Sequence, residues 1–405
     1  MSFARRYLLA LVAATGLGLS GIGAEAAVNI QCPATITNAQ TGQTTDPLVY
    51  CKHLSAGDGF SRMATGRTLY TFGFSDLTGV APGLELDAGI LAAQFTAPTL
   101  VFKEGTKAYL TLTNVGMLMR PDLFDPHTVH FHGFPNAATV YDGEPEASFG
   151  INMQESLNYY YNLVEAGTFI YHCHAEATEH MQMGMLGNLY VTPRQNGTPY
   201  EYPPNGGKTY TQFVYNDGDG STGYDVEFPL QLGSMDPVFH DLHIDVQPLP
   251  FANMLDTFQM LNGRGYPDTV NPDTLPPPDE KVGAGVMSSL NSSNPVSSLI
   301  SATAGQTILL RISNLSVTKY YTLGVMGLKM KVVGTGSHIL RGPRGTTDIS
   351  YETNSVNLGG GETADVLIDT TGVAPGTYMV YTTNLNYLSN DVEDFGGIMT
   401  EIRIN

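Results

Sequence analysis

The sequence is poor in charge, and basic residues are the scarcer kind. Charged residues make up 14% of its 405 residues, with 19 Lys and Arg against 38 Asp and Glu and a net charge of −19. A surface with this balance repels phosphate groups, so the composition argues against nucleic acid as a partner. Acidity of this kind is also common for solubility alone, so it identifies no partner by itself.

Long apolar runs are lacking after residue 26, so no membrane span is expected in the mature chain. The N-terminus differs, because the pair Arg5-Arg6 precedes an apolar segment at 7–23 and a small-x-small cleavage site at Ala24-Glu25-Ala26. Residues 1–26 are therefore expected to be a signal peptide with a faint likeness to a twin-arginine signal. The mature protein is expected to be periplasmic or secreted.

Cysteine is scarce, with three residues in the chain. Cys32 and Cys51 lie close together in sequence, and in an oxidising compartment they are expected to form a disulfide worth about 3 kcal/mol. Cys173 is then left alone. An odd cysteine in an exported protein requires a reason, and the histidines around it supply one.

The residues that are plentiful favour β-structure. The chain contains 45 Gly, 24 Pro and 22 Tyr, which suits a turn-rich all-β protein, and its length allows two or three domains. Short β-rich segments recur at the spacing of a sandwich or barrel, at 98–102, 107–113, 156–161, 168–171 and 307–312. We expect two units, at 28–195 and 209–405, joined by a polar connector.

The two units share a sequence frame. Residues 167–174, Gly-Thr-Phe-Ile-Tyr-His-Cys-His, align with residues 376–383, and residues 127–133 align with residues 321–327. Every His and the Cys of the first copy are replaced in the second. The first unit is therefore expected to bind metal, and the second to lack a metal site at the equivalent place.

Histidine is infrequent but concentrated, since six of the ten His residues lie within residues 127–180. A blue-copper site needs one thiolate and two imidazoles in a plane, with a weak axial thioether. Cys173, His180 and Met185 lie on one short segment, and His127 from a neighbouring strand is the candidate for the second imidazole. Two other methionines of the segment compete for the axial place, but the His-x4-Met spacing favours Met185.

The other four clustered histidines flank these positions. Because side chains alternate faces along a strand, His172 and His174 are expected to point away from Cys173. His130 and His132 share a face for the same reason. Two His-x-His pairs on adjacent strands form a four-imidazole patch that could hold one or two copper ions, and the backbone around Cys173 would connect the two sites for electron transfer.

These motifs resemble those of the multicopper oxidase family. In the first unit Asp125-Pro126 leads into the His-x-x-His-x-His run, and the family order continues with Asp142-Gly143, Gly167-Thr168, His172-Cys173-His174 and Gly184-Met185. The second unit resembles a copper-free domain of the family, with markers at 262–263, 310–314 and 361–366. The resemblance implies an all-β fold of two cupredoxin-like Greek-key β-barrels.

The resemblance also implies roles for the clustered residues, with copper as the cofactor. Four residues would bind type 1 copper: His127, Cys173, His180 and Met185. Four others would bind type 2 and type 3 copper: His130, His132, His172 and His174. Asp142 stands where the family has an acidic residue often linked to proton delivery, although a turn residue before Gly143 is an equally good interpretation.

The chain departs from the family in one respect. A full trinuclear cluster takes eight histidines in four His-x-His pairs, and this sequence has two pairs. His240 and His243 could contribute across a subunit interface, as in a homo-oligomer, although hydrogen-bonded or surface positions suit such isolated residues better. Copper nitrite reductase, a trimer of two-barrel subunits, also matches the His127-x4-His132 spacing, but that family has an acidic residue where His130 stands.

Three functions follow from this pattern. The favoured one is an oxidoreductase that takes electrons from a donor near His180, whether a small molecule, a metal ion or a redox protein. Electrons would pass through Cys173 to the four-imidazole patch, where an oxidant, expected to be dioxygen, is reduced. The alternatives are a blue-copper electron-transfer or copper-handling protein without a working cluster, and nitrite reduction by a homotrimer.

Overall fold

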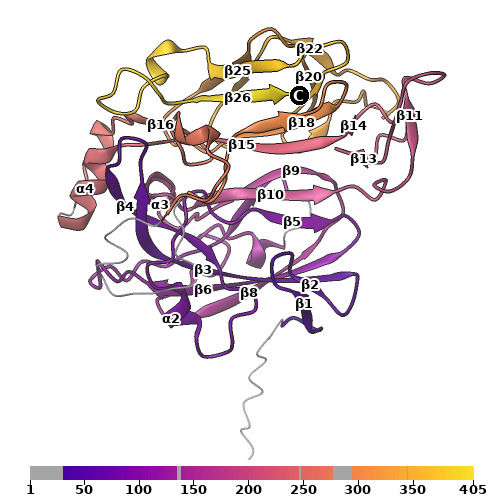
Figure 1. The fold of residues 1–405 in the computed structure, drawn as a ribbon. Helices are drawn as coiled ribbons and strands as arrows, with labels where there is room; N and C mark the ends of the chain where they lie inside the picture. Colours follow the sequence, from indigo (N-terminus) through magenta and orange to yellow (C-terminus); the bar gives the residue numbers. More distant parts are fainter. Residues whose placement is uncertain (1–30, 135–137, 246–247, 277–293, 344) are drawn as a thin grey trace, which may run out of the picture. The chain divides into compact units, whose positions relative to one another are not determined.

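The computed structural model describes residues 31–134, 138–245, 248–276, 294–343 and 345–405. Residues Cys32–Asn405 form one compact unit, drawn as a ribbon in Figure 1. The expected signal peptide at 1–26 lies outside the described residues. In the part of the chain that the structure describes, no helix has the length and apolar character needed to cross a bilayer.

The first barrel consists of two sheets. The larger sheet has the order β1 (Ile36–Asn38), β2 (Gln43–Thr44), β3 (Val49–Arg62), β6 (Lys107–Gly116) and β8 (Ser156–Asn162), with β4 (Thr68–Asp76) also paired to β3. The smaller has the order β5 (Leu100–Lys103), β10 (Leu186–Thr192), β9 (Gly167–His172) and β7 (His130–His132). The pairs β3–β6 and β5–β10 are parallel, so the chain must cross between the sheets, as in a Greek-key barrel.

The second barrel repeats this plan. One sheet has the order β16 (Phe258–Leu261), β15 (Val226–Met235), β18 (Thr307–Asn314), β24 (Thr363–Asp369), β20 (Met330–Thr335) and β21 (His338–Ile339), with β22 (Tyr351–Thr353) on β20. The other has the order β17 (Ile300–Ala302), β26 (Met399–Ile404), β25 (Gly376–Thr382), β19 (Tyr321–Val325) and β23 (Ser355–Leu358). The sequence repeat aligns β9 with β25 and β7 with β19, and these strands hold equivalent places in their sheets.

Shorter elements connect and cover the barrels. The segment expected to be a plain polar connector forms a hairpin of β11 (Tyr200–Tyr202) and β12 (Lys208–Tyr210), followed by β13 (Gln212–Phe213) and β14 (Gly223–Tyr224). The α-helices are α2 (Glu85–Gly89), α3 (Ala177–Met183) and α4 (Pro237–Asp245). The 3-10 helices are η1 (Thr139–Tyr141), η2 (Phe251–Asn253), η3 (Asp268–Val270) and η4 (Leu385–Tyr387). Helices α3 and α4 both pack on β4 (Figure 1).

Strand β9 is buried at every position because its two faces have different neighbours. Phe169 and Tyr171 lie in the apolar core of the first barrel, where full burial of such a side chain stabilises the fold by about 1.5–3 kcal/mol. Ile170, on the opposite face, packs with Met260 and Leu315 of the second unit. Alternation along β9 therefore separates a face inside the first barrel from a face toward the second barrel.

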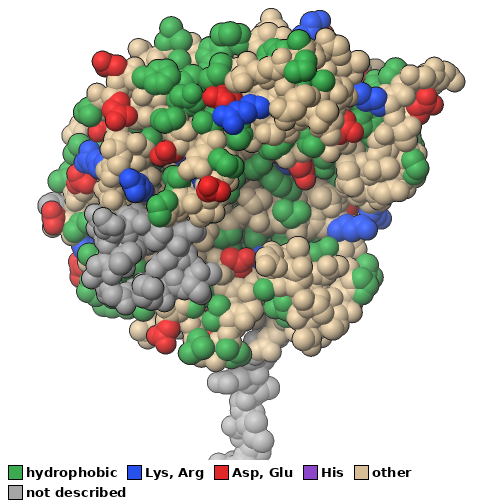
Figure 2. Space-filling model, viewed as in Figure 1, with side chains coloured by type: hydrophobic (Ala, Val, Ile, Leu, Met, Phe, Trp, Pro, Cys, Tyr) green, Lys and Arg blue, Asp and Glu red, His purple; other side chains and the backbone are tan. Residues whose placement is uncertain are grey.

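The disulfide prediction is confirmed, since Cys32 and Cys51 are bonded with their Cα atoms 5.9 Å apart. The unit boundaries at 28–195 and 209–405 stay predictions. On the face drawn in Figure 2, acidic side chains are scattered among basic, apolar and uncharged ones. The net negative charge therefore forms no single patch on that face.

Candidate copper sites

The thiol of Cys173 meets two imidazoles inside the first barrel. Its Sγ lies 3.3 Å from His180 Nδ1 and 3.8 Å from His127 Nδ1, and all three side chains are buried. The backbone N–H of Thr128 donates a hydrogen bond to the same sulfur, at 3.4 Å. One sulfur and two nitrogens therefore converge as in the plane of a blue-copper site. We call these three residues the Cys173 triad.

Local backbone structure positions the triad. Cys173 directly follows β9, and the His127 backbone pairs with Ile151 in an isolated antiparallel bridge. His180 lies on α3, which ends at Gly184 with φ +119°. A Cβ at Gly184 would lie 2.8 Å from the Phe72 carbonyl oxygen, so glycine lets the helix stop there and turn back.

The abrupt end of α3 places Met185 beside Cys173. The Met185 N–H donates to the His180 carbonyl at 2.9 Å, and the Cys173 N–H donates to the Met185 carbonyl at 3.1 Å. Met185 is fully buried in the same apolar core as Cys173. Its thioether is the type that a blue-copper site takes as a weak axial ligand.

The chemistry of the triad fits copper. The buried Nε2 atoms of His127 and His180 have no hydrogen-bond partner among the described residues. Burial lowers the pKa of His127, which keeps that ring neutral and able to donate a lone pair. Burial opposes charge on His180 as well, but the Cys173 thiolate and Asp125 outweigh it and raise its pKa to about 10. A bound cation would replace that proton beside the thiolate.

A second group of imidazoles lies on the other side of the same segment. His130 is directly opposite His172 in the β7–β9 ladder. Its ring centroid lies 5.4 Å from those of both His132 and His172, and 4.8 Å from that of His174. The structure thus brings together the four flanking histidines, which we call the four-histidine pocket.

Backbone carbonyls fix the tautomers in this pocket. The Nδ1–H groups of three rings donate to carbonyl oxygens: His130 to Asp142 at 2.6 Å, His132 to Gly361 at 3.2 Å and His172 to Cys173 at 2.7 Å. Each Nε2 is then a lone-pair donor, which is the usual arrangement of metal-binding histidines. Burial lowers the pKa of His132, and that of His172 to about 3, so both rings are neutral at pH 7.

Two of these lone pairs face each other. His132 Nε2 lies 2.9 Å from His172 Nε2, and neither nitrogen carries a proton once Nδ1 is the donor. Lone pairs at this distance repel, and a cation bound by both would remove the repulsion. The donor set of neutral imidazoles fits copper.

Asp142 lies at the mouth of the four-histidine pocket. Its carboxylate Oδ1 is 3.7 Å from His130 Nδ1, and it lines an open cavity of about 590 Å³ together with His130, His132 and His338. Gly143 next to it has φ +74°, and a Cβ there would lie 2.1 Å from the Val129 carbonyl oxygen. The residue therefore both precedes a tight turn and presents a carboxylate to the pocket.

The structure does not bring His240 and His243 to either group. His240 Nδ1 and Nε2 lie 2.6 Å and 3.0 Å from the carbonyl oxygens of Tyr70 and Gln182, and His243 Nε2 lies 2.5 Å from Glu179 Oε1. Both rings are fully buried in α4. This placement does not fit a contribution to copper across a subunit interface, because neither ring reaches the surface.

Acidic groups near His180 are the functional feature that the sequence motifs missed. Asp125 Oδ2 lies 3.9 Å from His180 Nε2, and Glu176 lies close to both. The His180 side chain is 0% exposed, whereas that of Asp125 is 17% exposed. Asp125 is therefore the more accessible of the two side chains. The signal was the position of Asp125 two residues before His127.

Comparisons with known proteins agree with this geometry. Residues 85–196 and 258–400 match two family models, each described as multicopper oxidase. Multicopper oxidase MCE of Talaromyces pinophilus is 32% identical over 120 residues, which are 29% of this chain and 18% of that protein. Laccase abr2 of Aspergillus fumigatus is 27% identical over 141 residues, 34% of this chain and 22% of that protein. The chain thus matches about a fifth of the length of these curated relatives.

Solved structures show the same fold. The blue copper oxidase of Nitrosomonas europaea has a TM-score of 0.60 and 20% identity, covering 87% of this chain and 85% of that chain. Copper nitrite reductase of Nitrosomonas europaea has a TM-score of 0.56 and 14% identity, covering 88% of this chain and 94% of that chain. At such identities the similarity establishes the two-barrel cupredoxin architecture.

Proposed function

Because the chain belongs to the multicopper oxidase family, we propose that it is a copper-dependent oxidoreductase, which oxidises an electron donor at the Cys173 triad and reduces dioxygen at the four-histidine pocket. The observation that carries the proposal is that one segment, His172-Cys173-His174, contributes to both groups. Copper held by the two groups would supply one-electron redox chemistry that no side chain of the protein can provide.

The protein's part is to join the two groups by a short covalent path. Cys173 faces the core with its sulfur near His127 and His180, while the preceding residue, His172, has its Nε2 2.9 Å from that of His132. An electron leaving the sulfur reaches the second group through the backbone of adjacent residues. The Thr128 N–H donates a hydrogen bond to the Cys173 sulfur and helps to hold it in place.

Reduction of dioxygen consumes protons, and Asp142 is placed to deliver them. Its side chain is partly exposed and lines the open cavity beside His130 and His132. It can therefore exchange protons with water on one side and with a reacting oxygen on the other.

The donor would bind over Asp125. The partly exposed Asp125 and the exposed Glu176 form an acidic rim next to the buried His180. Such a rim favours donors that are cationic or that carry a hydrogen-bond donor, such as a phenol or a metal ion.

We also propose that the protein works outside the cytoplasm. The expected signal peptide supports this, as does the Cys32–Cys51 disulfide, since disulfides persist in oxidising compartments. Assembly into a homo-oligomer, with a trimer as the first candidate, belongs to the same proposal, and the nitrite reductase fold neighbour favours it.

The decisive experiment is copper stoichiometry and electron paramagnetic resonance on the purified, sized protein. We expect more than one copper per chain, a blue thiolate charge-transfer band, and dioxygen uptake with a phenol. Cys173→Ser should abolish both the blue colour and the uptake. One copper per chain with reversible electron transfer and no uptake would instead support the electron-transfer alternative, and nitrite turnover without dioxygen uptake would support a nitrite reductase.

A further inference from the structure

The second barrel places a histidine at the mouth of the four-histidine pocket. His338 lines the same cavity of about 590 Å³ as His130, His132 and Asp142. We propose that His338 is a further copper ligand of this pocket, a fifth imidazole supplied by the second barrel of the same chain. The inference rests on the proposed function, because it requires copper in the four-histidine pocket.

A tight turn carries His338 to this place. Strands β20 and β21 form a hairpin with Thr335 opposite His338. The two residues between them, Gly336 and Ser337, have φ of +55° and +68°, as in the two-residue turns that match the twist of a hairpin. Ser337 is not a residue that adopts positive φ readily, so surrounding contacts must hold it there.

Those contacts attach the turn to both barrels. The Ser337 hydroxyl donates to the Thr168 carbonyl oxygen at 2.8 Å, and its N–H donates to Thr363 Oγ1 at 3.1 Å. A Cβ at Gly167 would lie 2.4 Å from the Ser337 carbonyl oxygen, so the backbones approach more closely than any side chain at 167 would allow. The residue before His338 is therefore fixed against β9, the strand that leads to His172.

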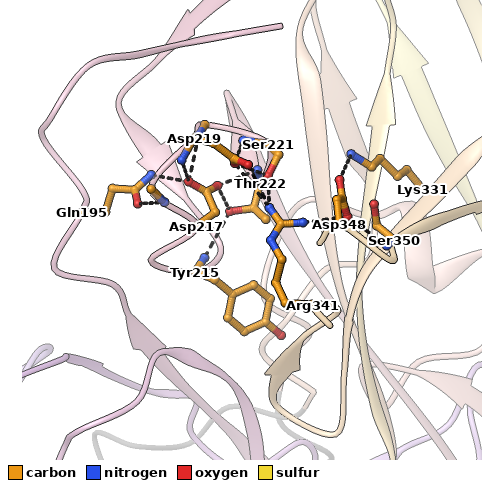
Figure 3. Close-up of polar contacts among 12 residues, drawn as sticks. Gln195, Tyr215, Asp217, Asp219, Ser221, Thr222, Lys331, Arg341, Asp348 and Ser350 are labelled. Atoms are coloured by element: carbon orange, nitrogen blue, oxygen red, sulfur yellow. Dashed lines mark hydrogen bonds and ion pairs between the residues drawn. The ribbon is translucent and has the colours of Figure 1, made fainter. Parts of the chain in front are cut away.

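The segment after His338 is fixed as well. Arg341 is an ion-pair partner of Asp348, at 2.7 Å, and of Asp219, at 3.3 Å, and it also donates to the Ser221 hydroxyl. Figure 3 shows its guanidinium between the loop that carries Asp219 and Ser221 and the Asp348 side chain. Asp217 holds that loop by accepting hydrogen bonds from the backbone N–H groups of residues 219, 220 and 222. His338 thus lies between two anchored points.

The His338 ring has an acidic neighbour, whereas His130, His132 and His172 have backbone carbonyls as Nδ1 partners. Its Nδ1 lies 3.4 Å from Glu165 Oε2, and with Nδ1 turned toward this carboxylate Nε2 is the ring nitrogen left to bind an ion. Carboxylate–histidine pairs of this kind orient many metal ligands. The side chain is 63% exposed, which leaves it free to move onto an incoming ion.

The consequence is a pocket with five imidazoles from two barrels. Five nitrogen donors suffice for two copper ions with two or three imidazoles each, and imidazole is a donor that copper prefers. The second barrel has no histidine at the positions of the repeated motif, but it supplies His338 from a different strand, β21.

The test compares apo mature protein, His338→Ala and the control Thr335→Ala in titrations with Cu²⁺ against a competing chelator. Thr335 is exposed on the same hairpin and does not line the cavity. We expect His338→Ala to keep the blue band while copper affinity of the second site falls at least about tenfold. Pulsed paramagnetic resonance of that site should show one fewer imidazole, and Thr335→Ala should match the parent.

Unchanged affinity and an unchanged imidazole count in His338→Ala would overturn the inference while leaving the proposed function intact. A parent protein that binds only its blue copper would overturn both. If His338→Ala loses the blue band, the variant Glu165→Gln provides the test instead. Retention of the blue band with a loss of second-site copper affinity smaller than that expected for His338→Ala supports the inference. Unchanged second-site affinity in Glu165→Gln opposes it.

Discussion

Neighbouring residues on one strand end lie in unlike environments. Cys173 is in an apolar core next to two imidazoles. His172 points to the other side of the strand, where its ring lies near those of three further histidines. Burial lowers the pKa of His172 to about 3, which secures a neutral ring well below physiological pH. The different surroundings of these two adjacent residues therefore separate a site with a cysteine sulfur from a site made of imidazoles.

At the residue scale we predict a specific role for the Asp142 carboxylate. Asp142→Asn should leave the blue band and the anaerobic rate of donor oxidation unchanged, because the Cys173 triad is untouched. Reoxidation by dioxygen should slow by about 10²-fold, since a positioned proton donor is lost. Stopped-flow measurement of the two half-reactions separates these effects. Glu144→Gln, an exposed acid two residues away, is the control and should behave as the parent.

At the scale of elements, the end of α3 couples helix geometry to the metal site. Gly184→Ala should destabilise the apo protein by about 1–3 kcal/mol, because φ is +119° and a Cβ would approach the Phe72 carbonyl oxygen to 2.8 Å. The blue band should also shift, since Met185 is displaced. Gly66→Ala is a matched control, with φ +83° and nothing within 4 Å. Equal losses in both variants would contradict the steric explanation.

Glu104 joins the end of the first unit to the start of the second. This carboxylate accepts from the Arg194 guanidinium at 2.9 Å, from the Arg194 N–H at 3.1 Å and from the Asn216 amide. Burial alone would raise its pKa, but the hydrogen bonds from Asn216 and Arg194 outweigh burial and lower it. The unfolded chain then binds a proton at higher pH than the folded one. Its contribution to stability is complete above the unfolded pKa of about 4.3 and is lost as pH falls through the folded value.

We therefore predict that Glu104→Gln lowers the free energy of unfolding by about 1 kcal/mol at pH 7. The difference from the parent should shrink below about pH 4, where Glu104 itself becomes protonated. Urea unfolding at pH 7 and pH 3.5 measures both values. A loss that is equal at the two pH values would show that the carboxylate charge is not the cause.

At the scale of the whole molecule, a buried polar network joins the barrels. Arg311 donates to Thr168 Oγ1 at 2.9 Å, the Thr168 hydroxyl donates to Asp365 at 2.5 Å, and Tyr215 donates to Asp365 at 2.6 Å. Arg311 and Asp365 are each about 1% exposed. Thr168 lies on β9, so this network supports the strand that ends at His172, next to Cys173.

Removal of one charge from this network should be costly. Arg311→Met leaves the Asp365 carboxylate buried without its cation, and we expect a loss of about 3–5 kcal/mol in the free energy of unfolding. The double variant Arg311→Met/Asp365→Asn should recover part of that loss. Unfolding can be followed by tyrosine fluorescence, because the chain has 22 Tyr and no Trp. A double variant no more stable than the single one would argue against charge burial as the cause.

Much of this molecule was predictable because its signals are local. Strand alternation separates His172 from Cys173, and the short segment from Cys173 to Met185 needs one short helix to bring its ends together. The contacts that escaped prediction join distant parts of the chain. The placement of His338 at the cavity that His132 lines depends on a turn packed against β9, and the burial of His243 depends on how α4 lies on β4. Neither leaves a periodic trace in the sequence.

The hydrogen bond from His132 to the Gly361 carbonyl crosses from one barrel to the other. The Cys173 triad thus lies inside one barrel, whereas the four-histidine pocket, built from first-barrel residues, is supported from the second barrel. A mild denaturant that weakens the contacts between the barrels should stop oxygen consumption before the blue band is lost. The blue colour alone would then overestimate how much active enzyme a preparation contains.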